Sequence, residues 1–284
     1  MKLRFALVAA LLLLASACAD LGAVQDYAKA SASVPGYDEA TKDFGSRFTR
    51  AEVYLDEKGR KTAQALTPER ERAVPDLLAV HKNLQAYMLV LGKLAGAQTF
   101  NLDKQTEGLQ KAVVAFPPFG LDADTANAAG TLGRLVAKWV LVGIQQHYVI
   151  ELVTEADPSI QAVTAGMRRI VDVYRKDLAN ERREVEAVDK INRPFISAAY
   201  PSASPSRDKL LAVLSDDHFR VKTAEFAARA ARLGELDKAL EKIANGHAEL
   251  RRNVNNLSSR EFAAALKAIA QDIWAAKGQI DKLS

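Results

Sequence analysis

One helical turn separates His147 from Glu151, and this pair is the best candidate in the chain for two metal ligands. Residues four apart on a helix face each other, so an imidazole and a carboxylate suit a ligand pair or an orienting hydrogen bond. Di-iron bundles carry a glutamate three residues before a histidine. No histidine here has one: Leu78 precedes His81, Ile144 precedes His147, Ser215 precedes His218 and Ala244 precedes His247. We therefore expect no metal and no cofactor, and His147 and Glu151 remain as the only metal candidates.

Other catalytic patterns are missing as well. The sequence contains no phosphate-binding G-x-x-x-x-G-K-[ST] loop, no dinucleotide fingerprint, no H-E-x-x-H and no G-x-S-x-G. His81 and His247 fall on apolar helix seams, where a polar residue commonly sets the register. The neighbours Asp216, Asp217 and His218 point to different faces of a helix and form a solvated cluster. We expect no catalytic residue and no small-molecule substrate.

The single cysteine, Cys18, ends a short N-terminal segment with a clear pattern. Lys2 and Arg4 are followed by an apolar run from Phe5 to Leu14 and by the small residues 15–17. The run is too short for a membrane span, which needs about 20 residues, and it indicates a signal peptide. The segment resembles the lipobox of bacterial lipoproteins. The resemblance covers about twenty residues and implies cleavage before the cysteine and acylation of its thiol and amino group. Ordinary secretion, with cleavage after residue 17, is the alternative.

The lipoprotein resemblance also implies a location. Ala19, rather than an aspartate, follows the cysteine, which in Gram-negative members of the family implies transport to the outer membrane. Two or more acyl chains hold a protein stably, since each buried methylene contributes about 0.8 kcal/mol. We expect an outer-membrane lipid anchor with the domain facing the periplasm. No cysteine remains for a disulfide within the monomer, a thiolate zinc site or cysteine catalysis.

The charge pattern gives little support to nucleic-acid binding. Removal of residues 1–17 takes away Lys2 and Arg4 and no acid, so the formal charge falls from +4 to +2. The remaining charges are interleaved, as in "KDLANERREVEAVDK" at 176–190. Such mixtures are typical of solvated helix faces rather than of basic patches.

The composition and spacing predict an all-α fold. Alanine is abundant, glycine and proline are sparse, and alternating β-branched runs are missing. Apolar residues recur at alternating steps of four and three, which predicts an elongated bundle of about five to seven long amphipathic helices with coiled-coil-like packing. The final segment shows the pattern: Phe262, Leu266, Ile269, Ile273, Ala276, Ile280 and Leu283. Helix starts are expected at Thr67-Pro68, at Asp157-Pro158, at Ser206 and, through a capping box, at Ser258.

The predicted helix starts suggest how the chain is organised. We expect a signal peptide over 1–17, a lipidated tether over 18–36, an N-terminal helical bundle over 37–191, a Pro/Ser-rich loop over 192–206 and a C-terminal helical hairpin over 207–284 packing on the bundle. The loop could instead be a crossover within one domain.

The segment 132–153 is apolar around most of a helical circumference, which suits either a buried central helix or contact with lipid. Charges at Arg134 and Lys138 interrupt it, so the buried central helix is favoured. The combined features predict a lipid-anchored, non-enzymatic scaffold, adaptor or envelope-structure protein that binds a protein partner through helix faces. A membrane-active, pore-forming-like protein that inserts 132–153 is the alternative, and a metal-binding bundle is a minor one.

Overall fold

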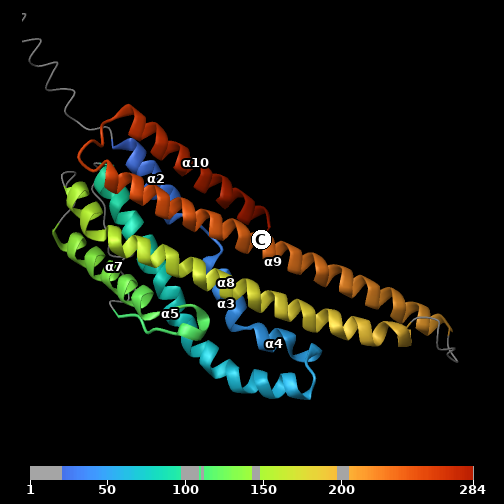
Figure 1. The fold of residues 1–284 in the computed structure, drawn as a ribbon. Coiled ribbons are helices and arrows are strands. Elements are labelled where there is room, and N and C mark those ends of the chain that lie inside the picture. Colours follow the sequence, from blue (N-terminus) through green and yellow to red (C-terminus); the bar gives the residue numbers. More distant parts are fainter. Residues whose placement is uncertain (1–20, 97–108, 110–111, 143–147, 197–204, 284) are drawn as a thin grey trace, which may run out of the picture.

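The computed structural model describes residues 21–96, 109, 112–142, 148–196 and 205–283, and no strand occurs among them. This confirms the predicted all-α bundle, whose long helices lie side by side in Figure 1. The helices are α2 (Gly22–Ala32), α3 (Tyr37–Gly45), α4 (Arg47–Ala51), α5 (Glu57–Ala95), α7 (Ala123–Val142), α8 (Val149–Ile196), α9 (Pro205–Arg252) and α10 (Arg260–Lys282), with 3-10 turns η1 (Glu52–Tyr54) and η2 (Pro117–Phe119).

The two longest helices dominate the shape. α8 and α9 each have 48 residues, which makes each about 72 Å long at 1.5 Å per residue. They run side by side, and the C-terminal end of α8 and the N-terminal end of α9 extend together past the other helices (Figure 1). We call residues 182–196 of α8 and 205–225 of α9 the hairpin end; its inner part still contacts α4 through Glu184 and η1 through His218.

Prolines do not interrupt the long helices where the sequence predicted starts. Pro68 lies inside α5, and Pro158 lies inside α8, nine residues after that helix begins. The predicted starts at Thr67 and Asp157 are therefore wrong. A proline costs one helical hydrogen bond, but in α8 the neighbours Ala156 and Ile160 are completely buried. Tertiary packing on both sides of the proline outweighs the local preference.

The cap residues show why the start signals misled. Thr67 donates to the carbonyl of Ala63 at 2.7 Å instead of capping a helix. The N-cap of α5 is Asp56, whose carboxylate accepts from the amide of Gly59 at 2.7 Å. The last helix is capped by Ser259, one residue later than predicted, and its hydroxyl accepts from the amide of Phe262.

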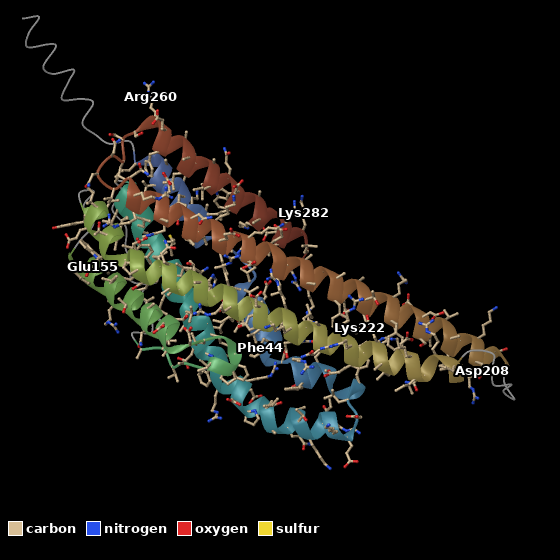
Figure 2. The ribbon with its side chains drawn as sticks, viewed as in Figure 1. Phe44, Glu155, Asp208, Lys222, Arg260 and Lys282 are labelled. Carbon is tan, nitrogen blue, oxygen red and sulfur yellow. The ribbon has the colours of Figure 1, made fainter. Side chains whose placement is uncertain are left out.

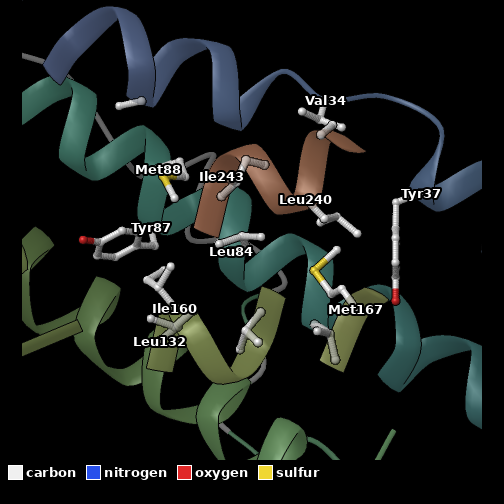
Figure 3. Close-up of a cluster of buried hydrophobic side chains, with 14 of the residues drawn as sticks. Val34, Tyr37, Leu84, Tyr87, Met88, Leu132, Ile160, Met167, Leu240 and Ile243 are labelled. Carbon is white, nitrogen blue, oxygen red and sulfur yellow. The ribbon is translucent and has the colours of Figure 1, made fainter. Parts of the chain in front are cut away.

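One continuous apolar core joins the helices. Figure 3 shows side chains from α5, α7, α8 and α9 meeting in its centre, among them Leu84, Leu132, Met167 and Ile243. Each of these four side chains is at most 2% exposed. The core includes buried residues on both sides of 192–206, so the helices after this segment pack on those before it.

The expected tether contains part of this core. Residues 22–32 of the 18–36 segment form α2, in which Val24, Tyr27, Ala28 and Ala30 are fully buried. α2 packs against α5 and α10. The apolar spacing of its side chains gives the short helix one buried face, and the described part of the core includes α2.

The apolar segment 132–153 is divided between two helices. α7 ends at Val142 and α8 begins at Val149. Leu132, Val136 and Trp139 of α7 are buried in the core, whereas Lys138 is exposed and contacts Glu155 at 2.8 Å. Within the described ranges, no helix is both long enough and apolar enough to cross a membrane.

Candidate functional site

A hydrogen-bonded chain of three side chains crosses the core. His247 Nδ1 lies 2.8 Å from Asp157 Oδ1, and His247 Nε2 lies 2.7 Å from the Tyr87 hydroxyl. The residues come from α9, α8 and α5. The chain satisfies the polar atoms of a histidine that is completely buried. Asp157, predicted as a helix cap, is used here instead.

The protonation state follows from burial and geometry. Burial lowers the pKa of His247, and the hydrogen bond to His247 lowers the pKa of Asp157. Burial raises the pKa of Tyr87 well above its usual range. A neutral imidazole therefore donates from Nδ1 to the carboxylate and accepts at Nε2 from the phenol. Because both nitrogens are used and the ring is buried, the group ties three helices together and leaves no nitrogen facing solvent.

A second polar cluster lies where the hairpin joins the rest of the bundle. Arg70 on α5 forms a two-point contact with Asp177 on α8, at 2.9 and 2.6 Å. The same guanidinium donates to the carbonyl of Phe44 and lies 4.2 Å from the centre of its ring. Both ionic side chains are about nine-tenths buried. Paired planar geometry of this kind suits arginine and not lysine.

Further ion pairs surround this contact and keep its charge balanced. Arg50 forms two hydrogen bonds of 2.8 Å with Glu181, and Arg47 lies 2.7 Å from Glu184. Arg229 on α9 donates to Asp43 on α3 at 2.9 Å. We call the cluster the ionic layer; it consists of Arg47, Arg50, Arg70, Arg229, Asp43, Asp177, Glu181 and Glu184. Since the cations and anions are equal in number, the layer has no excess charge to attract an ion.

A small cavity lies beside the ionic layer. It has a volume of about 40 Å³, and Tyr174, Glu181, Arg229 and Leu236 are among its lining residues. This volume holds a few water molecules at most and is far below the 300–1,000 Å³ typical of small-molecule sites. The cavity is therefore suited to water that bridges charged groups.

The predicted chemical residues are not brought together. Cys18 and His147 lie outside the described residues. Glu151 is exposed in the first turn of α8. In the part of the chain that the structure describes, no group of three or more histidine, cysteine, aspartate or glutamate side chains is placed to hold a metal ion.

The other histidines have local partners. His81 Nδ1 lies 2.9 Å from Asp38 Oδ1, and the ring is buried beside Tyr37. His218 is exposed and stacks on Tyr54, with 2.8 Å between its Nε2 and the tyrosine hydroxyl. His81 and His247 are both buried on the apolar seams predicted for them.

The hairpin end carries the most prominent exposed apolar group in the described structure. Ile191 on α8 is 65% exposed, and five residues of α9 are between 43% and 58% exposed. The α9 residues are Leu210, Leu211, Val213, Leu214 and Val221. Apolar spacing on a helix predicts a buried face, so these exposed residues were not predicted from the sequence. The missed signal is that "LLAVL" at 210–214 covers more of the circumference than one packed face needs.

In comparisons with known proteins, no protein-family model, no curated protein and no solved structure matches this chain.

Proposed function

We propose that this protein is a lipid-anchored, non-enzymatic scaffold or adaptor of the bacterial envelope, held in the outer membrane through Cys18 and facing the periplasm. Its working surface is the hairpin end. The exposed apolar side chains of α9 carry this proposal, because apolar groups gathered on one projecting surface mark interaction sites.

The arrangement of the chain supports this proposal. α2 begins four residues after Cys18, and its first turn lies at the end of the bundle opposite the hairpin end (Figure 1). An anchor at Cys18 would therefore hold the bundle close to the membrane and direct the hairpin end away from it. A partner that binds the hairpin end would then be a protein and not the lipid of the anchoring leaflet.

The membrane-active alternative receives no support from the packing of α7. Insertion of 132–153 would remove Leu132, Val136 and Trp139 from the core, where each is at most 2% exposed. Each large apolar side chain contributes about 1.5–3 kcal/mol when buried. Contacts with lipid would have to compensate for the free energy of this lost packing.

Acylation and surface use are tested separately. In cells fed labelled palmitate, we expect the wild-type chain to carry label and to fractionate with the outer membrane, and we expect Cys18→Ser to lose both. Label retained by Cys18→Ser would contradict the anchor.

The surface is tested by a photo-crosslinking residue placed at Ile191, with Arg260 at the opposite end of the molecule as the matched exposed control (Figure 2). We expect one discrete protein adduct from position 191 alone. Equal adducts at both positions, or none, would contradict use of the hairpin end.

Residues 19–284 retain the described core, which begins at Leu21, and lack the lipid. We expect this chain not to sediment with liposomes or release their contents. Binding with leakage would favour the membrane-active alternative, and stoichiometric metal in untagged protein would favour the metal-binding one.

A further inference from the structure

The projecting part of α9 has two apolar faces. One packs into the apolar core and includes the half-buried Phe219 and the buried Phe226. The other points away from the bundle at alternating steps of four and three. We call it the outer stripe: Leu210, Leu214, Asp217, Val221, Ala224, Ala228 and Ala231. All of these are exposed except the half-buried Ala228. This spacing is that of a coiled-coil seam without its second helix.

The outer stripe is left uncovered because α10 is shorter than α9. α10 runs antiparallel to α9, and Lys242 on α9 lies 2.6 Å from Asp272 on α10. Lys282 follows Asp272 by ten residues, so α10 ends at about the level of Arg232. Figure 2 shows α9 continuing from the level of Lys282 past Lys222 to Asp208. The outer stripe occupies this uncovered length.

We propose that the occupant is a second copy of this chain, whose α9 packs antiparallel on the outer stripe. The interface would be isologous, with the same stripe used by both copies around a twofold axis between Asp217 and Val221. This deepens the proposed function by naming one partner of the hairpin end. The dimer depends on the proposed function only because both use the hairpin end.

Side-chain size favours the antiparallel direction. With the axis between 217 and 221, Leu210 faces Ala228 of the other copy and Leu214 faces Ala224. Each of these outer layers then pairs one large side chain with one small one, which keeps the two helix axes evenly spaced. A parallel pair would set leucine against leucine at one end and alanine against alanine at the other, so the helices would diverge.

Charge favours the same direction. Asp217 is the one ionic residue of the outer stripe, and it pairs with Arg220 in its own chain. Antiparallel packing brings Asp217 beside Val221 and Arg220 of the other copy, so both carboxylates stay near cations. Parallel packing would bring the two Asp217 side chains together, and like charges in a coiled-coil seam oppose association.

The length of the outer stripe limits the expected affinity of the dimer. The outer stripe spans residues 210–231, about 33 Å of helix. One helix pair of this length is small compared with the roughly 1,600 Å² of a standard protein interface. We therefore expect a dimer that dissociates on dilution, and a membrane anchor shared by many copies would favour it by concentrating them.

Disulfide trapping tests the pairing. Residues 19–284 contain no cysteine, so each variant carries a single thiol. We expect a mixture of Leu214→Cys and Ala224→Cys chains to form the mixed disulfide, since facing positions in the seam are close enough to bridge. Thr223→Cys, exposed on another side of α9, is the matched control and should not crosslink above background. Efficient disulfides within Leu214→Cys alone would overturn the antiparallel arrangement.

Sedimentation tests the dimer itself. We expect residues 19–284 to shift from monomer to dimer with rising concentration, and Leu214→Glu to weaken the dimer by more than about tenfold by burying an unpaired charge. Thr223→Glu is the control. Leu214→Glu should keep the helix content and melting temperature of dilute wild-type protein, because this leucine is 56% exposed. A monomer at all concentrations would overturn the proposal while leaving the anchor test unaffected, and liposome binding lost in Leu214→Glu would assign the stripe to lipid instead.

Discussion

α9 passes through two different environments with the same kind of sequence. Near its C-terminal end, Leu236, Leu240 and Ile243 are at most 2% exposed, because α2, α8 and α10 surround this part of the helix. At the hairpin end, Leu210 and Leu214 are 57% and 56% exposed. Apolar periodicity shows that a helix has a face to cover, and only the neighbouring helices determine whether the chain covers it.

The largest expected effect is the loss of stability when a buried ion pair, rather than an exposed one, is broken. Arg70→Ala would leave Asp177 buried without its two-point partner, so we expect the free energy of unfolding to fall by about 3–5 kcal/mol. Arg193→Ala is the control at the hairpin end, where an arginine with a side chain that is 55% exposed contacts Asp189 and Asp216. We expect no measurable change for Arg193→Ala in urea denaturation. An equal loss of unfolding free energy in both variants would show that the buried Arg70–Asp177 pair stabilises the fold no more than an exposed ion pair does.

The next comparison concerns apolar side chains. Leu132→Ala empties space in the core and should cost about 2–5 kcal/mol, since the surrounding helices relax only partly. Ile191→Ala removes a 65% exposed side chain at the hairpin end and should change stability by less than about 0.5 kcal/mol. Urea midpoints of the two variants, measured in dilute solution, test this. If Ile191→Ala were the more destabilising variant, the hairpin end would be packed rather than exposed.

Two glycines of α9 should respond with opposite signs. A β-carbon at Gly246 would lie 2.3 Å from the ring of Tyr27, whose hydroxyl donates to the carbonyl of Ile243. We expect Gly246→Ala to destabilise the protein by about 1–3 kcal/mol through overpacking. Gly234 has no atom within 4 Å of its β-carbon position, so Gly234→Ala should stabilise the helix by about 0.5–1 kcal/mol. Thermal melts of both variants measure the signs, and a stabilising Gly246→Ala would contradict the close approach of α2 and α9.

The smallest expected effect is a pH dependence that belongs to the core alone. Burial lowers the pKa of His247, so the unfolded chain binds a proton more readily than the folded one. The contribution to stability is therefore full above the unfolded pKa of about 6.5 and is lost as the pH falls through the lower folded pKa. We expect unfolding midpoints to decrease as the pH falls below about 6.5, and we expect His247→Gln to flatten this decrease. An unchanged slope in the variant would show that other groups cause it.

Local sequence signals predicted the helices better than their ends. The apolar seam of α10 is confirmed: Phe262, Leu266, Ile273, Ala276 and Ile280 are all buried. The starts at Thr67 and Asp157 failed because a capping side chain can be used elsewhere, as Asp157 is by His247. His81 and His247 were placed correctly on seams, but their partners Asp38, Asp157 and Tyr87 come from distant parts of the chain and left no local pattern.

By itself, the sequence determined the all-α class, the long helices and most of their buried faces. These follow from residue propensities and from the spacing of apolar side chains, which are properties of one segment at a time. Only the tertiary structure decided that α2 belongs to the core, that four arginines meet four carboxylates in the ionic layer, and that one face of α9 stays open. The first two depend on which helices pack together and the third on how far α10 extends along α9, and these are set by segments far apart in the sequence.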